Sequence, residues 1–242
     1  MRTIGLLGGM SWVSTAHYYE LINAQVADAL GEGHCARLMV WQSDFADLTA
    51  LQRAGRWDAA GEFIAEGARA LVAGGAEMLA ICANTMHLVA DAVTAVAGEV
   101  PLVHIVDVVR DACIAIGAQK IALLGTQYTM ESPELFPPRL RAAGIEMLVP
   151  ALDERVAIHD HTYEELTRNV VTDQARATFR SACLRLIDQG ADAVVLACTE
   201  HGMVLADGDL PVPVLDSTAL HVRALVAASL GGAPWRTDPT AL

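Results

Sequence analysis

The fold is decided by two short apolar runs that both end in small residues, Ile4-Gly5-Leu6-Leu7-Gly8-Gly9 and Ile121-Ala122-Leu123-Leu124-Gly125-Thr126. The second run repeats the first 117 residues further along the chain. Two further matching segments, Gly75-Ala76-Glu77 and Gly190-Ala191-Asp192, lie 115 residues apart, and each opens another apolar run. Short apolar matches also arise by chance, but two pairs with nearly the same offset predict a duplicated unit.

Apolar runs of strand length alternate with longer amphipathic stretches from end to end. Continuous apolar strands separated by helices are typical of parallel sheets that are covered on both faces. We therefore expect an α/β fold with two similar halves and a ligand cleft between the carboxyl ends of their strands. The expected strands are Thr3–Gly8, Leu38–Gln42, Glu77–Ala83, Leu102–Ile105, Lys120–Gly125, Glu146–Val149, Ala193–Cys198 and Val212–Leu215. We expect residues 1–100 with 208–230 to form the first half, 101–207 the second half, and 231–242 a loose tail.

Composition excludes several classes of function. The 242-residue chain is 53% hydrophobic and only 19% charged, which argues against disorder. Its formal net charge of −13 repels phosphate, so nucleic acids and anionic membrane surfaces are disfavoured partners. No uninterrupted apolar stretch reaches the roughly 18 residues that a membrane span needs. The N-terminal run reads as a strand and not as a signal peptide, so we expect a cytoplasmic protein.

Polar residues follow the expected strands at the edge where ligands bind in open α/β sheets. These strand-to-helix turns point backbone N–H groups outward, and such groups can hold a carboxylate. Neither a GxxxxGK[ST] nor a GxGxxG phosphate loop is present. The turns are Gly8-Gly9-Met10-Ser11, Cys82-Ala83-Asn84-Thr85, Gly125-Thr126-Gln127-Tyr128-Thr129 and Cys198-Thr199-Glu200-His201.

These turns resemble the cofactor-independent aspartate/glutamate racemase superfamily. The longer strings GLLGGMSW, DFADL, NTMH, ALLGTQYTME and CTE are similar to its broad-specificity amino-acid racemase branch, over residues 2 to about 228. The resemblance implies two pseudo-symmetric Rossmann-like halves, an active site between them and often a homodimer. It also implies proton transfer at a carbon next to a carboxylate by two cysteines, one on each face of the substrate.

The chain departs from that pattern at the first cysteine. Ala83 stands directly before the Asn-Thr pair, where the family has cysteine, and Cys82 lies one residue earlier. Counting eight residues from Gly75 reaches Ala83, and counting eight from Gly190 reaches Cys198. One residue of displacement turns a strand side chain to the opposite face, so we expect Cys82 in the core unless a bulge intervenes. We expect Ala83 and Cys198 to face each other across the cleft.

Cys198 is the expected catalytic residue, and the N-terminus of the next helix could favour its thiolate. The other expected site residues match substrate-binding positions of the family, although asparagine and threonine also cap helices routinely. Glu200 could orient the thiol or a substrate amine, or be a solvated acid in the first turn of a helix. Gln52 replaces a basic residue that acid-specific relatives use, which favours a wider substrate range. The expected substrate-binding residues are Met10, Gln52, Ala83, Asn84, Thr85, Thr126, Thr129, Thr199 and Glu200.

No cofactor or metal is expected. Lys120, the only lysine, opens its strand at the end away from the expected site, which argues against a pyridoxal phosphate enzyme. His159 and His161 point in different directions on a helix and lack a third ligand in the sequence pattern. The five cysteines are scattered and form no CxxC pair, so they indicate neither disulfides nor zinc.

The favoured hypothesis is therefore an amino-acid racemase whose substrate is a small amino acid or carboxylate. We expect it to transfer protons mainly on one face of the substrate, because only one of the two cysteines is in place. One alternative is a single-cysteine decarboxylase that resembles the arylmalonate decarboxylases. Another is a non-catalytic protein that binds a small carboxylate.

Overall fold

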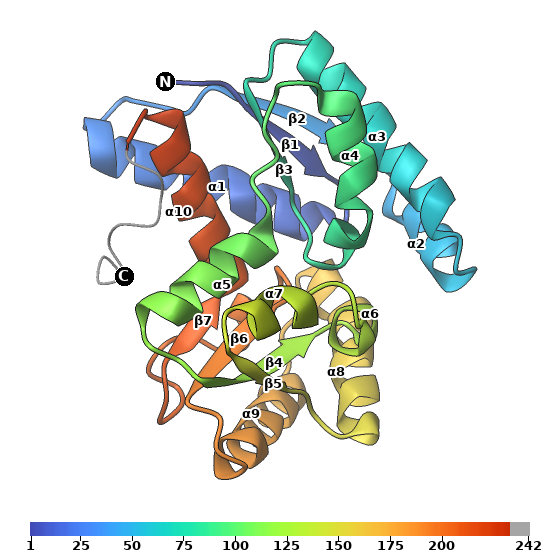
Figure 1. The fold of residues 1–242 in the computed structure, drawn as a ribbon, viewed down its shortest axis with the longest axis vertical. Helices are drawn as coiled ribbons and strands as arrows, with labels where there is room; N and C mark the ends of the chain where they lie inside the picture. The colour runs from blue at the N-terminus through green and yellow to red at the C-terminus, as the bar shows by residue number, and fades with distance from the viewer. Residues whose placement is uncertain (233–242) are drawn as a thin grey trace. The chain divides into compact units, whose positions relative to one another are not determined.

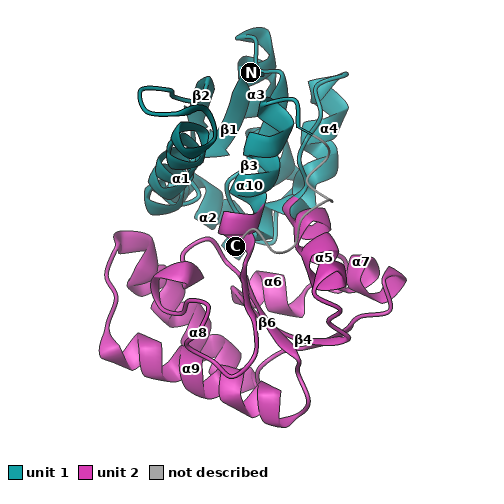
Figure 2. Cartoon of the chain, turned by 90° about the vertical axis from the view of Figure 1, so that its left-hand side faces the viewer, with its two compact units in different colours: residues 1–104, 221–238 teal, residues 105–220, 239–242 magenta. Residues whose placement is uncertain are grey.

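The computed structural model describes residues 1–232 in two compact units. Unit 1 contains residues 1–104 and the described residues from His221 onward, and unit 2 contains Ile105–Leu220 (Figure 2). The chain therefore passes from one unit to the other twice, after His104 and after Leu220. Except for residues 231 and 232, the expected loose tail lies outside the described residues.

Unit 1 is built on a three-stranded parallel sheet with the strand order β2-β1-β3 (Figure 1). Its strands are β1 (Ile4–Gly8), β2 (Leu38–Gln42) and β3 (Met78–Ile81). Its helices are α1 (Trp12–Leu30), α2 (Phe45–Arg53), α3 (Trp57–Ala73), the 3₁₀ helix η1 (Thr85–Val89) and α4 (Ala90–Ala97). The C-terminal helix α10 (Ser217–Ser229) begins in unit 2 and continues in unit 1.

Helices cover both faces of the unit 1 sheet, because β1 and β3 are buried at every position. One face packs on α1 and α10 through a cluster that includes Tyr18, Ile22 and Val222. The other face packs on α3 and α4 through a cluster that includes Ile64 and Val93. Each of these side chains is fully buried.

Unit 2 is built on a four-stranded parallel sheet with the order β5-β4-β6-β7. Its strands are β4 (Lys120–Gly125), β5 (Glu146–Leu148), β6 (Ala193–Ala197) and β7 (Val214–Asp216). Its helices are α5 (Ile105–Ala115), α6 (Gln127–Glu131), α7 (Pro137–Ala142), α8 (Leu152–Glu164), η2 (Leu166–Arg168), α9 (Asp173–Asp188) and η3 (His201–Met203).

The two sheets repeat the same arrangement, which confirms the predicted α/β fold with two parallel sheets. Strands β5, β4 and β6 follow the order of β2, β1 and β3. Ile4 pairs with Met78 in the first sheet, and Ile121 pairs with Ala193 in the second. Ile121 lies 117 residues after Ile4, and Ala193 lies 115 residues after Met78. These are the two offsets of the sequence repeat.

Two sequence predictions differ from the structure. Residues 208–220 belong to unit 2 and not to the first half, because β7 pairs with β6 along Val194↔Val214. Residues 101–104 belong to unit 1 and not to the second half, because Leu102 bridges to Leu79 of β3. The expected strand Leu102–Ile105 is reduced to a single bridge between Leu79 and Leu102, and α5 already begins at Ile105. Both errors concern pairing between distant segments, which local hydrophobicity does not specify.

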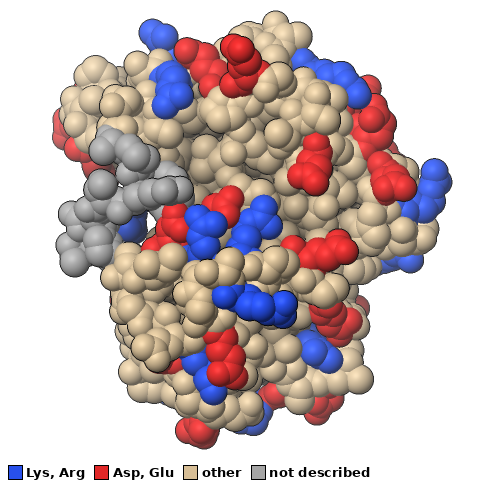
Figure 3. All heavy atoms as spheres, viewed as in Figure 1, with Lys and Arg blue, Asp and Glu red and all other residues tan. Residues whose placement is uncertain are grey.

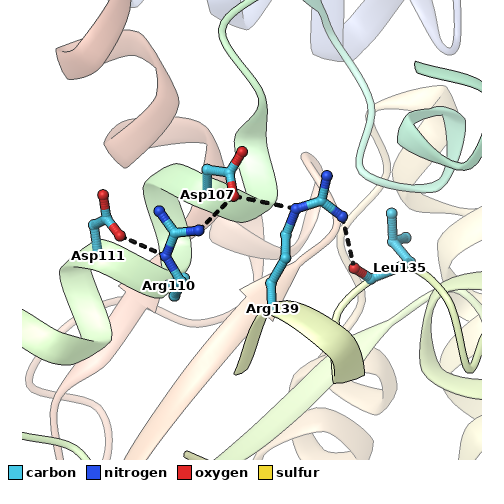
Figure 4. A network of polar contacts seen from close by, with 5 residues as sticks. All are labelled: Asp107, Arg110, Asp111, Leu135 and Arg139. Carbon is cyan, nitrogen blue, oxygen red and sulfur yellow. Dashed lines mark hydrogen bonds and ion pairs between the residues drawn. The ribbon is translucent and has the colours of Figure 1, made fainter. Parts of the chain in front are cut away.

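Charged side chains of both signs are interspersed on the face drawn in Figure 3. In unit 2, Arg110 binds Asp107 at 2.7 Å and Asp111 at 2.6 Å, and Arg139 binds Asp107 at 3.1 Å (Figure 4). This network ties α5 to α7 and commits both arginines to aspartates. Within residues 1–232, no helix is both long and apolar enough to cross a membrane.

Candidate active site

The end of β6 presents a buried thiol beside a carboxylate. Cys198 follows the last residue of β6 and is 7% exposed. Its Sγ lies 3.1 Å from Oε2 of Glu200 and donates to it. The Thr199 hydroxyl donates to the same oxygen at 2.8 Å, so one oxygen of Glu200 accepts hydrogen bonds from both Cys198 and Thr199.

Burial raises the pKa of the Cys198 thiol well above its ordinary value, and the negative charge of Glu200 raises it further. Hydrogen bonds from the backbone of Thr199 and Glu200 act in the opposite direction but do not outweigh burial. The following turn thus favours the thiolate in the expected direction, but burial and the charge of Glu200 outweigh its effect on the pKa. At neutral pH Cys198 is a thiol, a form that can donate a proton.

The end of β4 supplies two threonine hydroxyls. Thr126 caps α6, and its Oγ1 accepts from the backbone N–H of Thr129 at 3.3 Å. The two hydroxyl oxygens are also 3.3 Å apart. A Cβ at Gly125 would lie 2.9 Å from the Thr129 side chain, so glycine is required for this close approach. The Thr126 side chain therefore caps α6, and this contact is compatible with binding of a substrate.

His201 anchors the Cys198 turn to α8. Its backbone N–H donates to the Cys198 carbonyl at 3.1 Å. Its Nε2 lies 3.0 Å from the Thr162 hydroxyl, which itself donates to Ile158 O at 2.7 Å. Burial lowers the pKa of His201 to about 3, so this ring is neutral. Thr162 and His201 are 39 positions apart in the chain, and no sequence pattern indicates their contact.

In unit 1, alternate residues of β3 and its continuation point to opposite faces of the sheet. Cys82 lies with Met78 and Ala80 in the cluster on α1 and α10. Ala83 lies with Ile81 in the cluster on α3 and α4. Cys82 is fully buried, and burial raises its pKa. β3 pairs with β1 from Met78 to Ile81 without a bulge, and the backbone N–H of Cys82 continues this pairing by donating to Leu7 O at 2.9 Å, so the structure keeps Cys82 in the core.

Ala83 occupies in unit 1 the position that Cys198 occupies in unit 2. Ala83 lies five residues beyond Met78, the partner of Ile4, and Cys198 lies five residues beyond Ala193, the partner of Ile121. Both stand just beyond the carboxyl end of the third strand of their unit and keep a small exposed fraction, 8% for Ala83 and 7% for Cys198.

The other expected residues of unit 1 are also buried near this strand end. Asn84 and Thr85 begin the turn after Ala83 and are 2% and 6% exposed. Met10 packs in the same apolar cluster as Ala83. The Gln52 amide donates from Nε2 to the sulfur of Met86 at 3.1 Å. Each unit therefore gathers its own expected residues at the carboxyl ends of its strands.

The side chains that could suggest a metal or pyridoxal phosphate have other partners. His159 Nδ1 accepts from the backbone N–H of Gln127 at 3.3 Å, whereas His161 Nδ1 lies 2.9 Å from Glu165. Lys120 Nζ forms an ion pair with Glu146 at 3.1 Å at the amino end of β4. In the described part of the chain, no three histidine, cysteine, aspartate or glutamate side chains are arranged to hold a metal ion.

Two α/β units with parallel sheets match the fold of solved structures related to the Asp/Glu racemases. The chain belongs to the Asp/Glu/Hydantoin racemase family, whose model matches residues 7–225.

Three relatives illustrate the relationship. The broad specificity amino-acid racemase RacX of Bacillus subtilis (strain 168) is 25% identical over 175 residues, which cover 69% of this chain and 71% of RacX. A Yersinia pestis protein provisionally assigned as an Asp/Glu racemase is 37% identical, with a TM-score of 0.86 over 95% of this chain and 100% of that one. PH1733, an aspartate racemase homologue from Pyrococcus horikoshii OT3, is 28% identical, with a TM-score of 0.80 and the same coverage, 95% and 100%.

Arylmalonate decarboxylase is a more distant structural neighbour. It is 17% identical, with a TM-score of 0.54 over 96% of this chain and 94% of that one. This likeness shows a shared fold only.

Proposed function

We propose that this chain is a cofactor-independent amino-acid racemase with Cys198 as its main acid and base at Cα. We further propose that proton transfer is one-sided, because Ala83 stands at the equivalent strand end of unit 1. The observation that carries the proposal is the hydrogen bond from the Cys198 thiol to the Glu200 carboxylate at 3.1 Å. Membership in the racemase family supports the reaction class.

The thiol and the carboxylate together can move a proton in balanced steps. Cys198 first passes its proton to Glu200, which leaves a thiolate and a carboxylic acid. The thiolate then removes the Cα proton, and the electron pair of the C–H bond moves onto the substrate carboxylate as an enediolate. The thiol then exchanges its proton with the Glu200 carboxylic acid, and return of the new proton from the thiol to Cα completes exchange. Solvent protons enter through Glu200.

Hydrogen-bond donors at the strand ends would stabilise the enediolate, because preorganised donors act where charge develops. We assign the carboxylate-holding role to Asn84, Thr85, Thr126 and Thr199. Met10, Gln52, Ala83, Thr129 and Glu200 complete the proposed substrate-binding set.

The one-sided character follows from the chemistry of the two strand ends. Alanine carries no group that can accept or donate a proton. A positioned acid or base contributes roughly 10²–10⁴-fold, so its absence costs about 3–5 kcal/mol of barrier on one substrate face. Exchange with retention at Cα remains possible with Cys198 alone.

The neutral amide of Gln52 favours a wide substrate range over strict selection of acidic amino acids. It is buried at 5% exposure and donates to Met86. A carboxylate on the substrate side chain would find an amide dipole there and not a full positive charge. Cofactor independence is supported by the position of Lys120 at the opposite end of β4 from Thr126.

The test is incorporation of deuterium at Cα from D₂O, measured by mass spectrometry for both enantiomers of a panel of amino acids. We expect exchange to be faster for one enantiomer of the preferred substrate. Cys198→Ala should reduce it by roughly 10²–10⁴-fold. Cys183→Ala, which removes a buried thiol from α9, is the matched control and should retain exchange. Exchange that survives Cys198→Ala would refute the mechanism.

A second candidate is a decarboxylase, favoured by the single strand-end thiol in its protonated form. Such an enzyme needs one proton donor for the enediolate left by loss of carbon dioxide. Release of carbon dioxide from an arylmalonate, without α-deuteration of any amino acid, would support this alternative. Binding of a carboxylate with neither reaction would indicate a non-catalytic binder.

A homodimer and a cytoplasmic location are further proposals, taken from the resemblance and from the N-terminal sequence. Light scattering of the purified protein would test the first, and cell fractionation the second.

A further inference from the structure

We propose that His87 is a positioning residue that orients the Asn84-Thr85 turn by holding the carbonyl oxygen of Ala83. The imidazole is 4% exposed, and its Nδ1 lies 2.8 Å from that oxygen. A carbonyl can only accept, so Nδ1 carries the proton and donates it. The backbone N–H of the same residue donates to the Asn84 carbonyl at 3.0 Å. One residue therefore binds two successive carbonyls of the turn.

The equivalent turn of unit 2 is held differently. There the carbonyl of Cys198 accepts from the backbone N–H of His201, whose imidazole turns instead to Thr162. A backbone contact follows from the helical turn itself. A side-chain contact needs a ring that is fixed in place, so the unit 1 turn depends on what holds His87.

Two further histidines pack against the His87 ring. The ring centroid of His104 lies 4.6 Å from that of His87, and the centroid of His221 lies 6.0 Å away. His104 is the last residue of unit 1 before the chain enters unit 2, and His221 is the first after it returns. The ring that orients the turn is thus packed against residues at both passages of the chain between units.

His221 is itself fixed from two sides. Its Nε2 donates to the Val103 carbonyl at 2.8 Å, and its Nδ1 accepts from the Tyr18 hydroxyl at 2.8 Å. It is fully buried in unit 1. Both of its nitrogens therefore form hydrogen bonds. These bonds fix the orientation of the His221 ring, against which the His87 ring packs.

This arrangement has a consequence for catalysis, and the inference rests on the proposed function. The Ala83 carbonyl belongs to the peptide plane that joins Ala83 to Asn84. Rotation of that plane displaces the side chains of Asn84 and Thr85, which we assign to the substrate carboxylate. A misplacement of about 1 Å in a positioning group can lower a rate by roughly 10²-fold.

Two substitutions of similar size separate the hydrogen bond from packing. In His87→Asn, the amide nitrogen takes nearly the place of Nδ1 and keeps the donor to Ala83. In His87→Gln, the amide reaches the place of Nε2, and the donor to Ala83 is lost. For α-deuteration, His87→Gln should lower kcat/KM by roughly 10- to 100-fold, whereas His87→Asn should stay within about threefold of the unmodified protein. Equal loss in both variants, or no loss in His87→Gln, would overturn the proposal.

A measurement on the unmodified protein keeps the proposal testable where His87→Gln does not fold. Nitrogen-15 NMR of the imidazoles should show His87 protonated at Nδ1, and saturating amino-acid substrate should shift this resonance. The exposed His34 should not respond. An unprotonated Nδ1 would overturn the role of His87. So would a His87 resonance that does not shift on addition of a substrate whose Cα proton the protein exchanges. Absence of exchange from the unmodified protein with every amino acid would instead refute the proposed function itself.

Discussion

The ends of β3 and β6 occupy equivalent positions in two similar units but carry different chemistry. In unit 2, Cys198 donates to Glu200 at 3.1 Å. In unit 1, the equivalent Ala83 offers only its carbonyl, which His87 holds at 2.8 Å. Strands β2, β1 and β3 of unit 1 have the same order as β5, β4 and β6 of unit 2, and the pairing Ile4↔Met78 corresponds to Ile121↔Ala193. The strand-end side chains therefore differ between the units, although the backbone architecture is shared.

A second pair of contacts repeats between the units with different side chains. Gln52 on α2 contacts Met86, which lies three residues after Ala83. Thr162 on α8 contacts His201, which lies three residues after Cys198. In both units, the helix that follows the second strand fixes the turn after the third. The same two elements are in contact in each unit, but different side chains make the contact.

The largest expected effect comes from giving unit 1 the missing thiol. Ala83→Cys should speed α-deuteration of the slower enantiomer by up to roughly 10²–10⁴-fold, because it supplies a second acid and base. Ala83→Ser has similar bulk but a far weaker acid, so it controls for obstruction of the substrate. The quantity to compare is the ratio of the α-deuteration rates of the two enantiomers. If this ratio is the same in Ala83→Cys, Ala83→Ser and the unmodified protein, the two strand ends are not functionally equivalent.

Each unit also contains one fully buried histidine whose pKa burial lowers to about 3, His221 in unit 1 and His201 in unit 2. The unfolded chain binds a proton at these residues below about pH 6.5, whereas the folded chain does not until about pH 3. The free energy of unfolding therefore falls as pH decreases through this window, by at most about 1.4 kcal/mol per pH unit for each residue.

Replacing either histidine by glutamine should reduce the loss of stability between pH 7 and pH 5 by about 2 kcal/mol, as measured by urea unfolding. His34→Gln, at an exposed position, is the control and should leave the loss unchanged. An unaltered pH dependence in His201→Gln or His221→Gln would show that the residue is not held neutral in the folded protein.

A smaller effect is expected from neutralising the carboxylate beside the thiol. Burial raises the pKa of Cys198 most and the charge of Glu200 raises it further, so Glu200→Gln should lower this pKa and increase the thiolate fraction at a given pH. Peptide-resolved alkylation by iodoacetamide should accordingly begin at lower pH. In the same variant α-deuteration should slow, because the proton acceptor is lost. Slower alkylation would contradict the assigned interaction.

The smallest effect is expected at the cysteine in the core of unit 1. Cys82→Ala should lower the free energy of unfolding by about 1 kcal/mol, the usual result of a cavity the size of one buried group. It should leave α-deuteration unchanged, since the side chain packs on α1 and α10. Loss of exchange in a folded Cys82→Ala protein would overturn the assignment of Ala83 to the strand-end position.

Local pattern was sufficient for most of the fold. Leu38–Gln42 and Lys120–Gly125 are strands with the predicted bounds, because short apolar runs between helices have few other ways to be buried. The polar turns were also visible, since each follows an apolar run directly. Pattern failed at Leu102–Ile105, where an apolar segment enters a helix. It also failed for residues 208–220, whose strand pairs in unit 2.

The sequence by itself determined that two α/β units are present, that Ala83 matches Cys198, and which polar residues end the strands. These properties depend on spacing along the chain, and the two-residue period of a strand converts spacing into a choice of face. Only the tertiary structure decided that Cys198 rests as a thiol and that His221 bridges Tyr18 to Val103, because burial and contacts between distant segments arise when the chain packs.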